Sequence, residues 1–172
     1  MNDYLNIINH FDPISLSEMD KVKLLNRTDI KFVFHKENLD SILSEAVADY
    51  RVLEIDGARF SNYDTQYFDT ENFKFYLDHQ NGRADHYKVR MRSYVDSNLH
   101  YFEIKHKINK NRTVKSRIRI PYQERMIQGK AAELLKNETG LLPEMLKSAI
   151  RINCERTTLV NKELTERVTI DY

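Results

Sequence analysis

Several residue types that stabilise or link small proteins are scarce in this sequence. Cys154 is the only cysteine, so the chain cannot form an internal disulfide, and we expect a reducing, cytoplasmic environment. There is no tryptophan, and only three prolines and four glycines interrupt the chain, with no internal repeat or low-complexity segment. No apolar run approaches a membrane span, and the N-terminus lacks the pattern of a signal peptide. We therefore expect a globular protein without a membrane span.

An excess of charge of either sign is also missing. The 27 lysines and arginines nearly balance the 26 acidic residues, giving a net charge of +1. This balance argues against a protein that coats nucleic acid nonspecifically, and we expect no specific nucleic-acid partner. The hydrophobic fraction of 41% and the length of 172 residues suit one domain with its own core. We expect residues 1–172 to form a single domain, with residues 1–13 as an N-terminal extension.

Positive charge is concentrated between Arg83 and Arg119. This segment contains eleven lysines and arginines but only three acidic residues, a surplus of eight positive charges. It reads as three β-like runs, and alternation along a strand places the basic residues of each run on one face. These residues are Lys88, Arg90 and Arg92, then Lys105 and Lys107 beside Glu103, then Lys115, Arg117 and Arg119. Like charges on paired strands repel, so this face needs water or a polyanion.

The remaining segments predict both helices and strands. Ser15 and Glu18 form a capping-box pattern before a helix that should end near Asn26. Helices are also expected over residues 4–10, 36–48, 70–76, 123–136 and 143–150, and strands over 27–34, 51–56, 59–69, 151–160 and 166–172. Strands in hairpins outnumber helices, which predicts an α+β fold with an antiparallel sheet. An inward-facing basic face would give a β-barrel with helices packed outside, whereas an outward-facing one would give an ordinary half-covered sheet.

Five segments carry a recognisable pattern in a fixed order. They are LLNRTDIKFVF (24–34), YFDTENFKFYLDH (67–79), YKVRMRSYVDS (87–97), FEIKHKINKNRTVKSRI (102–118) and ERTTLVNKELTERVTID (155–171). Together they resemble the VTC domain, the polyphosphate-polymerase domain of vacuolar transporter chaperones, and its bacterial members in particular. The resemblance implies an antiparallel β-tunnel of the triphosphate tunnel metalloenzyme type. It also implies transfer of the terminal phosphate of ATP to a polyphosphate chain with a divalent metal, manganese or magnesium.

The resemblance also implies which residues bind phosphates and serve catalysis. They are Lys31 of the first tunnel strand, Arg90 and Arg92 of the RxR strand, Lys105, Lys115, and Arg156 of the R-x-T-L strand. Lys107 and Arg117 are expected to contact the same ligand. Glu103 is the candidate metal ligand, or it neutralises Lys105 and Arg90 instead. Arginine offers forked donors to phosphate oxygens and lysine offers point charges, so the set suits phosphoryl transfer.

Two departures from the family pattern bear on activity. Hydrolytic tunnel enzymes begin with glutamate-x-glutamate-x-lysine, where this chain has Arg27, Asp29 and Lys31, which disfavours a triphosphatase. Family members continue past the position of Tyr172 with a strand carrying a metal-binding glutamate, so we expect an incomplete tunnel in one chain. An exposed last strand over residues 166–172 would then favour a homo-oligomer.

Three functions remain open from the sequence. The first is a polyphosphate polymerase that binds ATP, triphosphate or polyphosphate, if the tunnel is completed. The second is a non-catalytic polyphosphate-binding or regulatory module, and the third is a triphosphatase. The basic runs also have a simpler interpretation as a solvated sheet face with scattered ion pairs.

Overall fold

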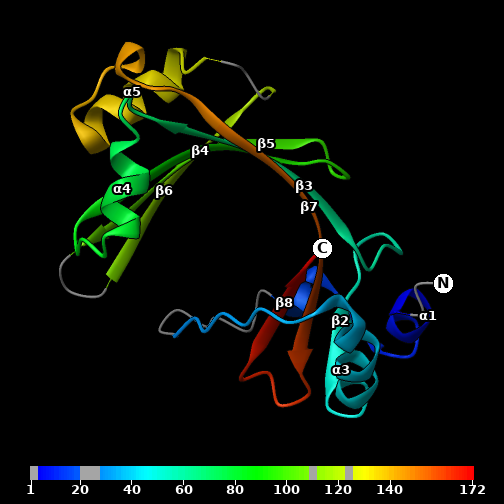
Figure 1. Cartoon of the computed structure of the whole chain (residues 1–172). Coiled ribbons are helices and arrows are strands. Elements are labelled where there is room, and N and C mark those ends of the chain that lie inside the picture. Colours follow the sequence, from blue (N-terminus) through cyan, green and yellow to red (C-terminus); the bar gives the residue numbers. More distant parts are fainter. Residues whose placement is uncertain (1–3, 20–27, 109–111, 123–125) are drawn as a thin grey trace. The chain divides into compact units, whose positions relative to one another are not determined.

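The computed structural model describes residues 4–19, 28–108, 112–122 and 126–172, and the chain divides into two compact units (Figure 1). The smaller unit comprises Met1–Ser61 and Glu155–Tyr172, and the larger one comprises Asn62–Cys154. Strand β7, Lys147–Asn161, contributes its first half to the larger unit and its second half to the smaller one. In the described part of the chain, no helix is long and apolar enough to span a membrane.

The smaller unit combines short helices with a small mixed sheet. Its helices are α1 (Tyr4–Ile8), α2 (Leu16–Met19), η1 (Lys36–Asn38) and α3 (Leu39–Ala46), and its further strands are β1 (Asp12–Ile14), β2 (Tyr50–Leu53) and β8 (Arg167–Asp171). Strand β2 pairs in parallel with β1 and antiparallel with β7, which also pairs antiparallel with β8. The apolar stripe of α3 buries Leu39 and Leu43 beside Val52 and Leu159.

The larger unit is built around long antiparallel strands. It contains β3 (Ser61–Asp69), α4 (Lys74–Gln80), β4 (His86–Tyr94), β5 (Leu99–Ile108), β6 (Arg112–Ile120), α5 (Gly129–Thr139) and η2 (Pro143–Met145). The strand order is β7-β3-β4-β5-β6, and the pairs from β3 to β6 are all antiparallel. Gln66 of β3 donates a hydrogen bond of 2.9 Å from its side chain to the carbonyl of Ile150 in β7.

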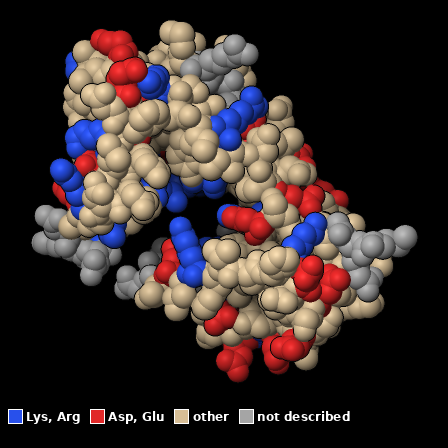
Figure 2. All heavy atoms as spheres, in the orientation of Figure 1, with Lys and Arg blue, Asp and Glu red and all other residues tan. Residues whose placement is uncertain are grey.

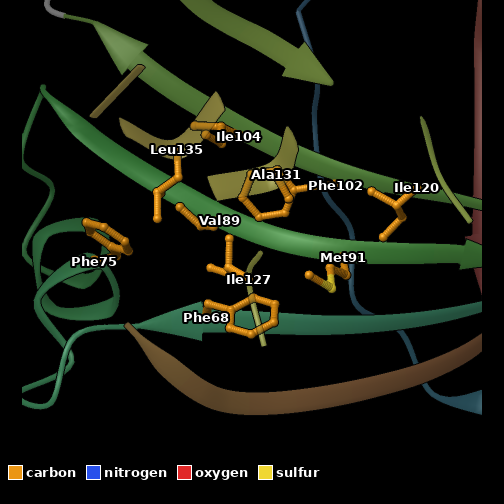
Figure 3. Packing of buried hydrophobic residues seen from close by; sticks show 10 residues of the cluster. All are labelled: Phe68, Phe75, Val89, Met91, Phe102, Ile104, Ile120, Ile127, Ala131 and Leu135. Atoms are coloured by element: carbon orange, nitrogen blue, oxygen red, sulfur yellow. The ribbon is translucent and has the colours of Figure 1, made fainter. Parts of the chain in front are cut away.

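One face of this sheet forms the core of the larger unit. Val89 and Met91 of β4 alternate with polar residues and lie in one cluster with Phe102 and Ile104 of β5 (Figure 3). The same cluster includes Ala131 and Leu135, so α5 covers the apolar face. Burying each large apolar side chain contributes about 1.5–3 kcal/mol. Because strand residues alternate, this packing fixes the opposite face as the one that carries the basic residues.

The predicted α+β class with a mostly antiparallel sheet is confirmed. The capping box is also present, because the Glu18 carboxylate accepts a hydrogen bond from the Ser15 amide and the Ser15 hydroxyl accepts one from the Glu18 amide. The continuation of that helix to Asn26 lies outside the described residues. Helix α4 begins at Lys74, four residues later than predicted, although the Thr70 hydroxyl accepts the Lys74 amide as a cap.

Two predicted elements are wrong. Residues 28–34 form no strand in the described structure, and Ile30, Phe32 and Val33 are 72%, 79% and 100% exposed. These apolar side chains pack against no other element of the described structure. β-propensity alone does not form a strand without a neighbouring strand or core to pack against. The predicted helix over 143–150 is the single turn η2 followed by the start of β7, because hydrogen bonding to β3 prevails over helical spacing.

Candidate functional site

The register of β4, β5 and β6 brings the basic residues of the sequence into rows across the sheet. Lys88 lies opposite Lys105, which lies opposite Lys115 on the next strand. The second row is Arg90, Glu103 and Arg117, and the third is Arg92, Tyr101 and Arg119. We call these nine residues the basic face. Figure 2 shows lysine and arginine side chains interspersed with carboxylates on the surface that it presents.

At the centre of the basic face is a buried ion pair. Arg90 is 6% exposed and Glu103 is fully buried. The Nε and Nη2 atoms of Arg90 lie 2.7 Å and 2.6 Å from Oε2 of Glu103, and the Lys115 ammonium contacts Oε1. Burial would raise the pKa of the Glu103 carboxyl, but the Lys115 hydrogen bond and the Arg90 charge outweigh it and lower this pKa. Glu103 is therefore ionised and neutralises its two cationic neighbours.

Lys105 lies beside this pair in a different electrostatic position. Burial, followed by the positive charges of Arg90 and Lys115, lowers the pKa of its amine to about 8. Glu103 opposes this shift, but no acidic side chain of the described residues forms an ion pair with Lys105. Its two direct cross-strand neighbours are both lysines. This part of the basic face favours an anionic ligand.

Tyrosines support the arginines of the basic face. Arg90 donates a hydrogen bond of 3.1 Å to the hydroxyl of Tyr67, and Arg92 lies 5.3 Å from the ring centroid of Tyr63. Arg117 lies 4.8 Å from the ring centroid of Tyr101. Cation–π contacts of this kind hold guanidinium groups in position without neutralising their charge. Tyr101 was not predicted for the site, although its alternation with Glu103 places it on this face.

The other predicted site residues are placed less centrally. Lys107 is exposed and lies opposite His86 and Thr113, at the end of the same face. Lys31 belongs to the smaller unit, in the exposed segment that forms no strand, so its predicted position on a first tunnel strand is wrong. Arg27, which stands at the first position of the glutamate-x-glutamate-x-lysine pattern, lies outside the described residues. The structure brings Arg90, Arg92, Lys105, Lys115 and Arg117 together within the larger unit.

Arg156 also belongs to the smaller unit and already has a carboxylate partner. Its Nε and Nη2 atoms lie 2.5 Å and 2.7 Å from the two carboxylate oxygens of Asp171. This forked geometry is the one in which arginine would hold a phosphate. Strand β8 thus supplies an internal anion at the position where the sequence predicts a ligand contact.

The residues of the basic face do not fit a metal ion at Glu103. Both oxygens of this carboxylate contact cationic side chains, and a divalent cation would be repelled by Arg90 and Lys115. Among the described residues, no group of three or more histidine, cysteine, aspartate or glutamate side chains could hold a metal. The neutralising role is the interpretation of Glu103 that the geometry supports.

Comparison with known proteins identifies the family of this chain. The family model of the VTC domain matches residues 26–172, and no curated protein matches the sequence. One similar solved structure is that of a candidate adenylate cyclase from Vibrio parahaemolyticus, at 11% sequence identity and a TM-score of 0.47. The similarity covers 81% of this chain and 64% of that chain, so this chain spans less than two thirds of that protein's length. Because the family model matches most of its residues, the chain belongs to the VTC domain family.

Proposed function

We propose that the basic face binds the linked phosphates of a triphosphate-type ligand: ATP, triphosphate or polyphosphate. The observation that carries this proposal is the row of Lys88, Lys105 and Lys115, which lie directly opposite one another on three neighbouring strands. Neighbouring strands are about 4.8 Å apart, so the three lysine side chains leave the sheet from a short line of backbone positions. A linear polyanion matches such a line better than a single small anion, because it offers several charges along its length.

The arginines beside this row suit the same ligand. Arg92 and Arg117 contact tyrosine rings, and neither forms an ion pair with a carboxylate of the described residues. Guanidinium groups form forked hydrogen bonds with phosphate oxygens. Phosphoryl transfer asks a protein mainly for positioning and charge neutralisation. In a polyphosphate polymerase, a terminal oxygen of the polyphosphate would bond to the γ-phosphorus of ATP while the bond to the β–γ bridging oxygen breaks and ADP leaves. The basic face would neutralise the charge of both partners.

Calorimetric titration with tripolyphosphate tests the binding proposal. We expect one binding event that weakens with rising salt, because counterions compete for the cationic face. A single-stranded oligonucleotide serves as the control polyanion and should not displace tripolyphosphate at matched phosphate concentration. Absence of tripolyphosphate binding, or equal competition by the oligonucleotide, would refute specific recognition of linked phosphates.

A non-catalytic binding or regulatory module is the second candidate function. The observation that favours it is Glu103, because the carboxylate of the basic face is fully engaged by Arg90 and Lys115. The expected manganese or magnesium ion therefore has no support from Glu103 and stays a prediction. Incubation with ATP and manganese, followed by gel detection of long-chain polyphosphate, separates the two functions. Product formation selects the polymerase, and tripolyphosphate binding without product selects the module.

A further inference from the structure

Lys105 lies in the middle of the row of three lysines on the basic face. Lys88 and Lys115 are directly opposite it on the two neighbouring strands. The positive charges of Arg90, Lys115 and Arg92 act on its amine, so these cationic groups surround it. The residue is nevertheless partly exposed, so a small molecule can reach it. Lys105 is therefore an accessible amine inside a cluster of cations.

These surroundings make the amine of Lys105 more reactive than that of an ordinary lysine. A lysine attacks an electrophile only in its neutral form, and burial or a neighbouring cation favours that form. Burial, Arg90 and Lys115 lower the pKa of Lys105 to about 8, whereas an unperturbed lysine has a pKa of about 10.4. At pH 8 about half of Lys105 is therefore neutral, against less than about 1% of an unperturbed lysine.

Lys115, the next residue of the row, is in a different situation. Its ammonium contacts Oε1 of the ionised Glu103 carboxylate. An ammonium that is held by a carboxylate has no lone pair with which to attack. Within the part of the sheet that the structure describes, no carboxylate forms an ion pair with Lys105. The geometry thus sets Lys105 apart from its neighbour as the nucleophile of the row.

We propose that Lys105 is an acylation site for acyl phosphates, the mixed anhydrides of a carboxylic acid and phosphoric acid. The phosphate of such a reagent binds the cationic side chains around Lys105, and this contact brings the acyl carbon to the amine. This inference rests on the proposed phosphate binding and adds a means by which that binding is regulated.

The chemical step needs no further reactant. The neutral nitrogen of Lys105 attacks the carbonyl carbon and forms a C–N bond, and the C–O bond to the phosphate breaks with its electron pair leaving on the phosphate. The amine gives up one proton, which water or the released phosphate accepts. The product is an uncharged amide, so the row loses its central positive charge and linked phosphates bind less tightly.

Binding of the phosphate group has two opposing effects on the rate of acylation. A bound anion favours the charged amine and so lowers the fraction of neutral Lys105. Positioning of reacting groups, by contrast, gives effective concentrations of about 10⁵–10⁸ M in well-oriented systems. Because an acyl phosphate carries at most two negative charges, positioning outweighs the loss of neutral amine.

Treatment with acetyl phosphate at pH 8, followed at each lysine by mass spectrometry of peptides, tests the proposal. Lys136, which is exposed in α5, serves as the internal reference. We expect Lys105 to be acetylated at least tenfold faster than Lys136, at a rate that saturates with acetyl phosphate and falls when tripolyphosphate is added. Equal or slower reaction of Lys105, or a rate that tripolyphosphate does not lower, would overturn the inference.

A reagent without phosphate separates recruitment from the reactivity of the amine itself. N-Hydroxysuccinimidyl acetate delivers the same acetyl group but has no anion for the basic face to hold. The preference for Lys105 over Lys136 should be at least tenfold greater with acetyl phosphate, and Arg92→Met should reduce this excess. The same preference with both reagents would refute recruitment through the phosphate.

Calorimetry with tripolyphosphate before and after acetyl phosphate treatment measures the consequence for binding. The affinity of the wild-type protein should fall at least tenfold, because a charge-assisted contact is lost. Lys105→Arg keeps the charge and offers no amine for acylation, so the same treatment should not change the affinity of this variant. An unchanged wild-type affinity, or an equal fall in Lys105→Arg, would exclude Lys105 as the regulating site.

The outcomes also separate this inference from the proposed function. If the untreated protein binds tripolyphosphate and acetyl phosphate shows no preference for Lys105, the acylation site alone is refuted. If the untreated protein does not bind tripolyphosphate, the proposed phosphate binding fails and recruitment of acyl phosphates fails with it.

Discussion

Arg90 directs two nitrogen atoms, Nε at 2.7 Å and Nη2 at 2.6 Å, at the same carboxylate oxygen of Glu103. The two residues are direct cross-strand partners, and both are buried. This arrangement gives Arg90 a structural role in addition to its proposed contact with phosphate. Replacing Arg90 would therefore not be a clean test of phosphate binding.

The first prediction concerns the stability of this pair. Glu103→Gln should lower the free energy of unfolding by about 3–5 kcal/mol, because it leaves Arg90 buried without its counter-charge. Urea denaturation measures the change. The double variant Arg90→Met/Glu103→Leu should recover much of the loss, since it removes both charges together. A loss below about 1 kcal/mol for Glu103→Gln would show that the pair is better solvated than the structure indicates.

The second prediction concerns pH. The pKa of Lys105 is lowered to about 8, chiefly by burial, so its amine loses its proton as the pH rises through that value. Tripolyphosphate affinity should therefore fall above about pH 8, and binding there should take up a proton, because a bound polyanion favours the charged amine.

The matching variant for this prediction is Lys105→Arg, which stays charged throughout the range. The ratio of wild-type to Lys105→Arg affinity, measured by calorimetry between about pH 7 and 9.5, cancels the titration of the ligand itself. This ratio should decline with pH. A flat ratio would mean that Lys105 does not contact the ligand or keeps its proton.

The third prediction isolates one arginine. Arg92 is held by the Thr65 hydroxyl at 3.1 Å and by the Tyr63 ring, and these are neutral partners. Arg92→Met should weaken tripolyphosphate binding by about ten- to a hundredfold with little effect on stability, because a charge-assisted hydrogen bond contributes about 1.5–3 kcal/mol. Lys136→Met, an exposed change in α5, is the control and should leave the affinity unchanged. Equal effects of both changes would indicate only a general charge effect.

The fourth prediction decides the role of Arg156. Asp171→Asn removes the carboxylate that Arg156 contacts, and stability should change by less than about 1 kcal/mol because Asp171 is about half exposed. If Arg156 binds phosphate, this change should tighten polyphosphate binding about threefold, since a competing negative charge is gone. Calorimetry with polyphosphate measures it, and Arg156→Met should reverse the gain. An unchanged affinity in Asp171→Asn would leave Arg156 with a structural role alone.

The sequence predicts the basic strands well because two independent patterns agree there. The apolar residues Val89, Met91, Phe102 and Ile104 had to share one face for the core, and the basic residues then had to share the other. The pairing of Glu103 with Arg90 and Lys115 follows from the register of β4, β5 and β6, which a single strand does not reveal.

The sequence misleads where local pattern lacks a tertiary partner. Residues 28–34 alternate like a strand, yet Val33 is fully exposed and the segment pairs with no described strand. Residues 147–150 have helical spacing, yet they extend along β3 as part of β7. An apolar pocket lined by Leu77 and Ile150 was missed for a related reason: these residues are far apart in sequence, and only the fold brings them to one cavity.

The strict alternation of β5 limits how this protein can diverge from its relatives. Inserting one residue ahead of Phe102 would turn Phe102 and Ile104 toward the charged side and direct Glu103 and Lys105 under α5. Interior packing and the proposed anion binding would then be lost in a single step. Point substitutions are consequently the tolerated route to a new ligand preference, whereas changes in length belong in the turn at residues 95–98.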